Sequence, residues 1–573
     1  MTALVIRLRE LLQRFFHLSD WQATLFWAAV VGVVGALATE AFRWTLHAVE
    51  TFLFGHGGGL VAIARGLPWY WRIAVPTMGG LIAGGLLVLA QRVSVKKATS
   101  DYMEAIVVGD GRIPMAQTLA RSGSSLVSIA SGASIGREGS MVQLAALGAS
   151  IVGRLLRFPV ERLRLLVACG AAAGITAAYN APIAGAFFVA EIVLGSIAME
   201  IVGPLLLSAV VANIVMREFP GYQPVYEMPP FPPIFGVEVV LFALMGILIG
   251  LAAAFFLRGL QASRNLFTRV PVALPLRLAL GGLVVGVIST MVPEVWGNGY
   301  SVVNGNLRDT GPWLVLLGLL AAKGVATLAT VGSGAVGGVF TPALFFGCMI
   351  GALFGTGMQS LWPLGTSAPF AYAIVGMGSF LAAMTQAPLM AILMIFEMTL
   401  SYQVMLPLMA ACVTAYFVVR SADVGAMYEI SVRRRKESDA RLQLRKLQLR
   451  TLVEPAMTTV GLDAERPEMM DLFHRFPVKY LYVVDSSSHY LGVVSLKSLS
   501  GGSLESTDAR HAADFLSQEV SPVTSGMDLA EALRRFMEHR GERLPLVEST
   551  IDPVLLGVVS KSALLQTYFK LSA

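Results

Sequence analysis

The chain has 573 residues, of which 55% are hydrophobic and 14% are charged. About 25% of the residues of an ordinary soluble protein are charged, so this composition excludes a soluble globular protein and predicts one that crosses the membrane many times. The formal net charge of +6 is modest, and we expect the lipid bilayer, with no nucleic acid, as its environment.

The N-terminal segment, residues 1–20, has arginine and glutamate within an apolar pattern and lacks a small-residue cleavage site. It is therefore predicted to be an amphipathic helix on the cytoplasmic membrane surface and not a signal peptide. Residues 21–431 are the predicted membrane domain. Several of its apolar segments are shorter than the roughly 20 residues of a spanning helix, and others are split by Gly, Pro or Asn. Because irregular backbone survives at membrane depth only inside protein or along a cavity, broken helices predict a transport pathway.

The first break contains GREGS (136–140), which places Arg137 and Glu138 inside an apolar region. A charge at bilayer depth costs about 2.5–3.5 kcal/mol, so such residues are expected to be functional. Glu138 precedes an apolar run and should begin a helix, where the helix dipole amounts to about +0.5 charge and favours an anion. We predict that its carboxylate is a tethered anion that competes with a soluble one. The alternative is a loop at the membrane edge with a surface ion pair.

Two later stretches reveal an internal repeat. CGAAAGITAAYNAPIAGAFFVAEI from Cys169 aligns without a gap on VGMGSFLAAMTQAPLMAILMIFEM from Val375, at a constant offset (375 − 169 = 206). Glu191 thereby superposes on Glu397, and we interpret both as structural residues that accept hydrogen bonds at helix ends. Glycine-rich breaks precede both copies, at 132–140 and 332–342. Two halves with matching broken helices predict a transporter or channel with its ion site where the halves meet.

The composition becomes soluble towards the C-terminus. Residues 432–450 form a basic linker, and by the positive-inside rule the part of the chain that follows is cytoplasmic. Two units then share one order of elements, over 451–500 and 517–573: a turn, an amphipathic helix, a strand, a hairpin turn, the string LGVVS and a second helix. This order predicts a tandem α+β domain over 451–573.

Nothing in the sequence indicates a metal or an enzyme. Cys169, Cys348 and Cys412 lie in separate apolar segments without disulfide or metal-ligand spacing. The seven histidines avoid the central apolar segments, and no His/Cys/Ser constellation is present. We predict no metal, no cofactor and no enzymatic activity.

Taken together, GREGS, GSGAVGGVFTP, YNAPIAG, its QAPL repeat copy and the C-terminal pair resemble the CLC family of chloride channels and chloride/proton antiporters, with a tandem pair of CBS motifs. The resemblance implies an all-α polytopic membrane protein of two inverted-topology repeats of broken helices, plus the α+β CBS pair. It also implies a homodimer with a pore in each subunit, in a bacterial inner membrane. The transported ion is chloride, together with protons if the protein is an antiporter.

The resemblance assigns roles to individual residues. Glu138 matches the gating glutamate, which occupies an anion site when ionised and leaves it when protonated. Val339 and Phe340 match backbone donors to the anion, which bind it without a full positive charge that would trap it. Tyr428 matches a tyrosine whose hydroxyl donates to the central anion, and its alternative role is an interfacial aromatic anchor.

The central serine of the family lies in a Gly-Ser-Gly-Ile-Pro turn, from which this chain departs. Residues 109–114, GDGRIP, look similar but would place Asp110 or Arg112 at the anion. Ser100 lies at a more suitable distance from Glu138 and is our preferred candidate, with a plain helix cap as the alternative.

A second departure concerns protons. Coupled exchangers of the family carry an acidic pair that begins at the position of Glu191, and here the second member is Ile192, which cannot carry a proton. Glu191 or water would then supply a proton route, or the protein is a passive channel. Ile192 favours a chloride channel gated by Glu138 in a voltage- or pH-dependent way, and the chloride/proton antiporter is the alternative. In the GREGS motif itself, Ser140 replaces the family's usual proline.

Two further alternatives remain open at this point. A CBS-bearing divalent-cation transporter would need clustered intramembrane acids, whereas Glu138, Glu191 and Glu397 are scattered along the sequence. In the CBS pair, Ser498 and Ala563 stand where nucleotide-binding members carry aspartate. Adenine-nucleotide binding is therefore doubtful, and a structural or dimerising role is equally compatible with the residues.

Overall fold

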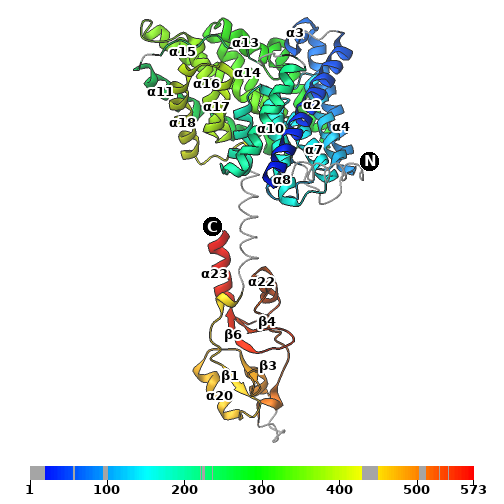
Figure 1. Cartoon of the computed structure of the whole chain (residues 1–573), viewed down its shortest axis with the longest axis vertical. Coiled ribbons are helices and arrows are strands. Elements are labelled where there is room, and N and C mark those ends of the chain that lie inside the picture. The colour runs from blue at the N-terminus through cyan, green and yellow to red at the C-terminus, as the bar shows by residue number, and fades with distance from the viewer. Residues whose placement is uncertain are drawn as a thin grey trace. The chain divides into compact units, whose positions relative to one another are not determined.

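The structure is a computed structural model, which describes residues 20–55, 59–93, 101–219, 221, 226–234, 236–428, 449–501, 511–527, 529–539 and 541–572. Contacts divide the chain into two compact units, Met1–Val432 and Arg433–Ala573 (Figure 1). Residues 1–19 of the predicted amphipathic helix and most of the predicted linker lie outside the described residues.

The first unit is helical, and eight helices of its described part are long and apolar enough to cross a membrane. The prediction of a polytopic all-α membrane domain is thus confirmed. Its first half comprises α2 (Asp20–Phe54), α3 (Leu60–Gly66), α4 (Trp69–Val93), α5 (Tyr102–Val107), α6 (Met115–Ala130), α7 (Glu138–Leu155), α8 (Val160–Tyr179), α9 (Pro182–Phe187), η1 (Phe188–Leu194) and α10 (Met199–Glu218). Its second half comprises α11 (Glu238–Arg269), α12 (Leu274–Met291), η2 (Pro293–Val295), α13 (Tyr300–Arg308), α14 (Trp313–Gly332), α15 (Phe340–Leu361), α16 (Pro369–Thr385), α17 (Pro388–Thr399), η3 (Tyr402–Val404) and α18 (Met405–Ser421).

The backbone reproduces the repeat seen in the sequence. Helices α8 and α16 both end at a left-handed residue, Asn180 with φ 56° and Gln386 with φ 55°. A proline then begins the next helix of each half, at Pro182 in α9 and Pro388 in α17. Asparagine tolerates the left-handed conformation, and proline suits the first turn of a helix because that turn needs no internal N–H donor. The same local chemistry therefore breaks both helix pairs at equivalent places.

Helices α8 and α16 also form the centre of the unit, and both consist mainly of small and apolar residues. All residues of α8 from Leu166 to Tyr179 are buried, as are all residues of α16 from Ala371 to Thr385. A helix that is apolar on every side belongs inside a bundle. Small residues allow the backbones to approach closely: a Cβ atom on Gly376 of α16 would overlap the carbonyl oxygen of Gly347 in α15.

The second unit contains two three-stranded sheets that repeat one pattern. In each sheet the first strand runs parallel to the second, and the second pairs antiparallel with the third, so the orders are β1-β2-β3 and β4-β5-β6. This confirms the predicted α+β pair. Its elements are η4 (Leu449–Leu452), β1 (Thr459–Gly461), α20 (Arg466–Arg475), β2 (Tyr480–Val484), β3 (Tyr490–Ser495), α21 (Leu496–Gly501), η5 (Ala512–Phe515), β4 (Val523–Thr524), α22 (Leu529–Glu538), β5 (Arg543–Val547), β6 (Leu555–Ser560) and α23 (Lys561–Ser572).

Candidate functional site

The glycine-rich breaks of the two halves meet inside the first unit. Gly136 donates its N–H to the Gly338 carbonyl oxygen at 2.8 Å, and Gly338 donates to the Gly136 carbonyl oxygen at 2.9 Å. Helix α7 begins two residues after the first glycine, and α15 begins two residues after the second. This bridge holds two helix N-termini side by side, and each supplies N–H groups without an intrahelical partner and a partial positive charge.

Glu138 is the first residue of α7, and only 2% of its surface is exposed. Its Oε1 atom accepts a hydrogen bond from the Tyr300 hydroxyl at 2.9 Å and a second, short one from the Thr341 hydroxyl. The Tyr179 hydroxyl lies 2.9 Å from Oγ1 of Thr341. Side chains of α13 and α15 thus donate to one carboxylate oxygen of α7, and a side chain of α8 contacts one of these donors. The burial of Glu138 does not fit the surface ion pair that the sequence left as an alternative.

The other carboxylate oxygen of Glu138, Oε2, is buried and has no hydrogen-bond partner among the described residues. It lies against the two bridging glycines, and a Cβ atom on Gly136 would overlap it. Only glycine leaves room for the carboxylate at this point. A carboxylate oxygen therefore occupies a small space between two helix N-termini, where an inorganic anion would gain from the partial positive charges of both helix ends.

Two cationic side chains lie near this cluster. The Arg137 guanidinium lies 5.3 Å from the centroid of the Tyr300 ring, within the range of a cation–π interaction. Lys323, in the middle of α14, is 1% exposed and donates from Nζ to the carbonyl oxygens of Val295 and Gly297, at 2.8 and 2.6 Å. The lysine thus fixes the turn that leads to Tyr300.

Val339 and Tyr428 line a common cavity of about 300 Å³, together with Gly139, Gly338 and Asp101. Phe340, the first residue of α15, is 1% exposed and does not itself line the cavity, but it contacts the Tyr179 ring at a centroid distance of 5.1 Å. A chain of rings connects the cavity with the Glu138 cluster: Tyr428 contacts Phe188 at 5.9 Å, and Phe188 contacts Phe340 at 6.2 Å. Four residues predicted from the sequence, Glu138, Val339, Phe340 and Tyr428, therefore belong to one connected region.

Ser100 lies outside the described residues, so its predicted role stays a prediction. The competing stretch, residues 109–114, forms the connection between α5 and α6. Asp110 there is exposed and forms a surface ion pair with Arg112 at 3.4 Å. Neither residue lines the cavity.

Glu191 and Glu397 form a reciprocal pair of helix caps. Glu191 accepts hydrogen bonds from the backbone N–H groups of Leu389 and Met390, at 3.3 and 2.7 Å, in the first turn of α17. Glu397 accepts the equivalent bonds from Ile183 and Ala184, at 2.9 and 2.8 Å, in the first turn of α9. This geometry matches the structural role expected of both glutamates.

Ile192 follows Glu191 within η1 and is 7% exposed. It packs into the hydrophobic core of the first unit. No proton can reside on this side chain, so the position that the resemblance associates with proton transfer is apolar in the structure as well as in the sequence.

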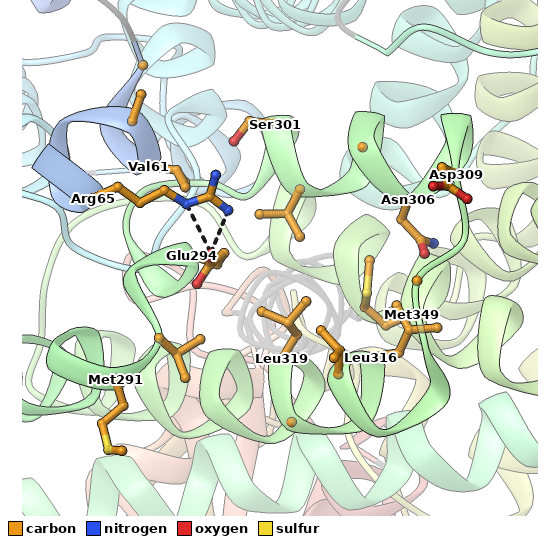
Figure 2. Close-up of a pocket in the computed structure, with 18 residues that line it drawn as sticks. Val61, Arg65, Met291, Glu294, Ser301, Asn306, Asp309, Leu316, Leu319 and Met349 are labelled. Atoms are coloured by element: carbon orange, nitrogen blue, oxygen red, sulfur yellow. Dashed lines mark hydrogen bonds and ion pairs between the residues drawn. The ribbon is translucent and has the colours of Figure 1, made fainter.

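A second, larger cavity of about 680 Å³ lies apart from these residues (Figure 2). Its lining comes mainly from α3, α13 and α14, and Arg65 donates across its edge to Glu294 at 2.6 Å. None of the residues predicted for the site lines it. Cavity volume alone therefore does not locate the site.

In the second unit, the positions expected to carry aspartate are engaged in local turns. Ser498 donates its hydroxyl to the Ser495 carbonyl oxygen at 2.7 Å, and its N–H bonds to the Ser495 hydroxyl at 3.1 Å. The N–H of Ala563 bonds to the Ser560 hydroxyl at 3.3 Å. Neither position offers a carboxylate, and nucleotide binding stays a doubtful prediction.

These features define an integral membrane protein whose two repeats place broken helices around a buried carboxylate. A family model described as "Voltage gated chloride channel" matches residues 79–420, and one described as "CBS domain" matches residues 512–570. The chain belongs to the CLC family of chloride transport proteins, and it is a multi-span chloride transporter of that family with a C-terminal CBS pair.

The chain resembles individual members over most of their length. It is 54% identical to a "Putative chloride channel protein ClcB-like" of Ralstonia nicotianae, over 72% of this chain and 98% of the relative. It is 40% identical to the "Voltage-gated ClC-type chloride channel ClcB" of Salmonella typhi, over 70% and 97%.

Solved structures of the same fold were also found. A slow cyanobacterial Cl⁻/H⁺ antiporter is 26% identical with a TM-score of 0.63, over 73% of this chain and 98% of that one. A eukaryotic CLC transporter, 18% identical with a TM-score of 0.59 over 94% and 97%, shares the fold.

Proposed function

We propose that this protein exchanges chloride for protons and that Glu138 is its gate. The observation that carries the proposal is the burial of a carboxylate between the N-termini of α7 and α15, where one of its oxygens has no hydrogen-bond partner among the described residues. An ionised Glu138 would occupy the anion's place, and a protonated one would lose the attraction of both helix ends and leave it.

In the sequence, the apolar residue Ile192 favoured a chloride channel. The comparisons give more support to chloride/proton exchange. The cyanobacterial structure is described as an antiporter and resembles this chain at 26% identity. The curated relatives carry names of channels, so a gated channel is the second candidate. The family assignment gives no support to a divalent-cation transporter.

The proposal also covers the membrane location, the orientation and the oligomeric state of the protein. We expect it in a bacterial inner membrane, with the basic residues after α18 and the CBS pair on the cytoplasmic side. We also expect a homodimer. Exposed apolar side chains on α10 and α18, such as Ile214 at 55%, Leu406 at 69% and Phe417 at 58%, offer a surface that either lipid or a second copy would cover.

The test reconstitutes the purified protein in liposomes, imposes a chloride gradient and records chloride efflux and external pH together. We expect chloride-driven proton movement against a proton gradient, abolished in Glu138→Gln while chloride still passes, because glutamine cannot be ionised. Glu294→Gln removes a carboxylate of the surface ion pair with Arg65 and serves as the matched control. Chloride flux without proton movement in the unaltered protein would replace the antiporter with the channel.

A further inference from the structure

An antiporter needs a group that passes protons between the cytoplasm and its gate. Glu138 is 2% exposed and cannot exchange protons with bulk water directly. Ile192 is apolar, and the Glu191 carboxylate already binds two backbone N–H groups at the start of α17. A titratable group on the cytoplasmic side, in contact with the pathway, would supply this step.

Among the described residues, Asp101 is the acid that lines the cavity of about 300 Å³. The same cavity touches Gly139, which follows the gate residue, and Tyr428, which lies just before the predicted cytoplasmic part of the chain. Water occupies about 30 Å³ per molecule, so the cavity has room for several waters that connect these groups. Asp101 is itself exposed, so protons from water can reach it.

The backbone beside Asp101 is tied to the gate helix. The N–H of Tyr102 donates to Oε1 of Gln143 at 3.0 Å, and Gln143 lies in α7, which begins with Glu138. Gln143 is held in turn by a hydrogen bond from Nε2 to Thr118 of α6, at 3.3 Å. These bonds fix the start of α5, and with it Asp101, at a defined place relative to the gate.

Charged and titratable groups of several elements share the cavity with Asp101. Arg121 of α6 and Arg264 of α11 line the same cavity, as do the phenols of Tyr102 and Tyr428. Arg164 of α8 binds carbonyl oxygens of residues 108 and 109, at the other end of α5. The two arginines attract chloride to the cavity, whereas an ionised Asp101 repels it.

We propose that Asp101 is the cytoplasmic proton acceptor of the exchange cycle. Its carboxylate takes a proton from cytoplasmic water and becomes neutral, which removes its repulsion of chloride. The proton then crosses the cavity water to Gly139, the neighbour of the gate residue, and from there passes to the Glu138 carboxylate, while Asp101 returns to its ionised form. This inference rests on the proposed antiport. Asp101 also caps α5, since its Oδ1 accepts the Met103 N–H at 3.1 Å, and the test must separate the two roles.

Two substitutions separate proton transfer from capping. Asn is as good an N-cap as Asp but carries no proton, so Asp101→Asn keeps the cap and removes the acid. Glu is not a preferred N-cap but keeps the acid, so Asp101→Glu does the reverse. We expect the ratio of protons to chloride ions in liposomes to fall at least tenfold in Asp101→Asn and to stay within about threefold of the original in Asp101→Glu. Asp110→Asn, an exposed acid that does not line the cavity, is the matched control.

A third variant makes the outcome decisive. Asp101→Asn combined with Ile192→Glu introduces an acid at the apolar position, and partial recovery of the ratio would confirm that only a proton carrier was missing. An unchanged ratio in Asp101→Asn, or a fall that Asp101→Glu shares, overturns the inference while the antiport stands. Absence of proton movement in the unaltered protein overturns the antiport first and the role of Asp101 with it.

Discussion

Two hydroxyl groups hold one oxygen of the Glu138 carboxylate, whereas the other oxygen faces the bridging glycines. Hydrogen bonds to a charged group contribute about 1.5–3 kcal/mol each, so under the proposed function Tyr300 and Thr341 stabilise the ionised, seated form of the gate. The Tyr300 hydroxyl also lies 3.2 Å from Oγ1 of Thr341, so the two donors form one cluster. Under the proposed function, this cluster slows transport because the carboxylate must break both bonds before it leaves.

Tyr300→Phe is therefore expected to speed chloride transport. Removal of one charge-assisted bond shifts the balance between seated and released glutamate by roughly tenfold or more, and chloride efflux from liposomes should rise in the same direction. Tyr226→Phe is the matched control, because the Tyr226 ring packs on Tyr300 at 5.1 Å and its hydroxyl has no partner among the described residues. An efflux rate in Tyr300→Phe equal to that of Tyr226→Phe would contradict the idea that the Tyr300 hydroxyl holds the Glu138 carboxylate in place.

The sequence predicted some of these residues and not others, for a physical reason. Glu138 is conspicuous because a charge in an apolar region carries a high cost. Tyr300 and Thr341 are ordinary residues in their own segments, and they meet Glu138 only because two repeats fold against each other. Lys323, like Glu138, is a charged residue in an apolar stretch. The same reasoning would have predicted a structural or functional role for Lys323 from the sequence.

At the scale of elements, the two halves cap each other. Glu191 accepts hydrogen bonds from N–H groups in the first turn of α17, and Glu397 accepts them from the first turn of α9. Each half thus supplies the acceptor for the N–H groups at the start of a helix in the other half. From the gapless repeat, the sequence predicted that both glutamates accept hydrogen bonds at helix ends, since equal spacing puts equal chemistry at equal places. It could not predict that the caps cross between halves, because no local pattern encodes that contact.

The reciprocal arrangement predicts that Glu191→Gln and Glu397→Gln behave alike. Each replaces a carboxylate that accepts two backbone N–H bonds at a partly exposed helix end, and each should lower the stability of the protein by about 1–3 kcal/mol. Thermal unfolding in detergent measures this loss, and proton–chloride ratios are measured on the same samples. A proton route through Glu191 would instead reduce the ratio in Glu191→Gln alone, with Glu397→Gln as its symmetric control.

At the scale of the whole molecule, the chain joins a membrane unit to a soluble unit with its own hydrophobic cores. Within the soluble unit the two CBS motifs are joined through their hairpin turns. Tyr490 donates its N–H to the Pro553 carbonyl oxygen, and Leu555 donates to that of Ser488, both at 2.9 Å. The change in composition predicted where the membrane domain ends. The contact between the two hairpin turns joins residues far apart in the sequence, and no local pattern predicts it.

His489 makes this contact sensitive to pH. Its two ring nitrogens lie 2.9 Å from carboxylate oxygens of Asp485 and Asp552, one in each motif. Both nitrogens can donate only when the ring is protonated. The hydrogen bond to Asp485 and the charge of Asp552 raise the pKa of His489 above its usual 6.5, and the same hydrogen bond lowers the pKa of Asp485 below 3.8.

The pairing should therefore be strongest between about pH 4 and 6.5. The stabilisation from His489 is complete below its ordinary pKa of 6.5 and is lost as the pH rises through its raised value. The stabilisation from Asp485 is present above pH 3.8 and is lost as the pH falls through the lowered pKa of this carboxyl.

Hydrogen exchange of the Tyr490 and Leu555 amides in the full-length protein, corrected for intrinsic rates, should accelerate from pH 5.5 to pH 8 by roughly two- to fivefold, since exposed ion pairs are weak. Asp552→Asn should flatten this dependence, and His474→Gln, which alters an exposed histidine on α20, should leave it unchanged. Equal pH dependence in the Asp552→Asn variant and the original protein would remove the histidine from the contact between the two motifs.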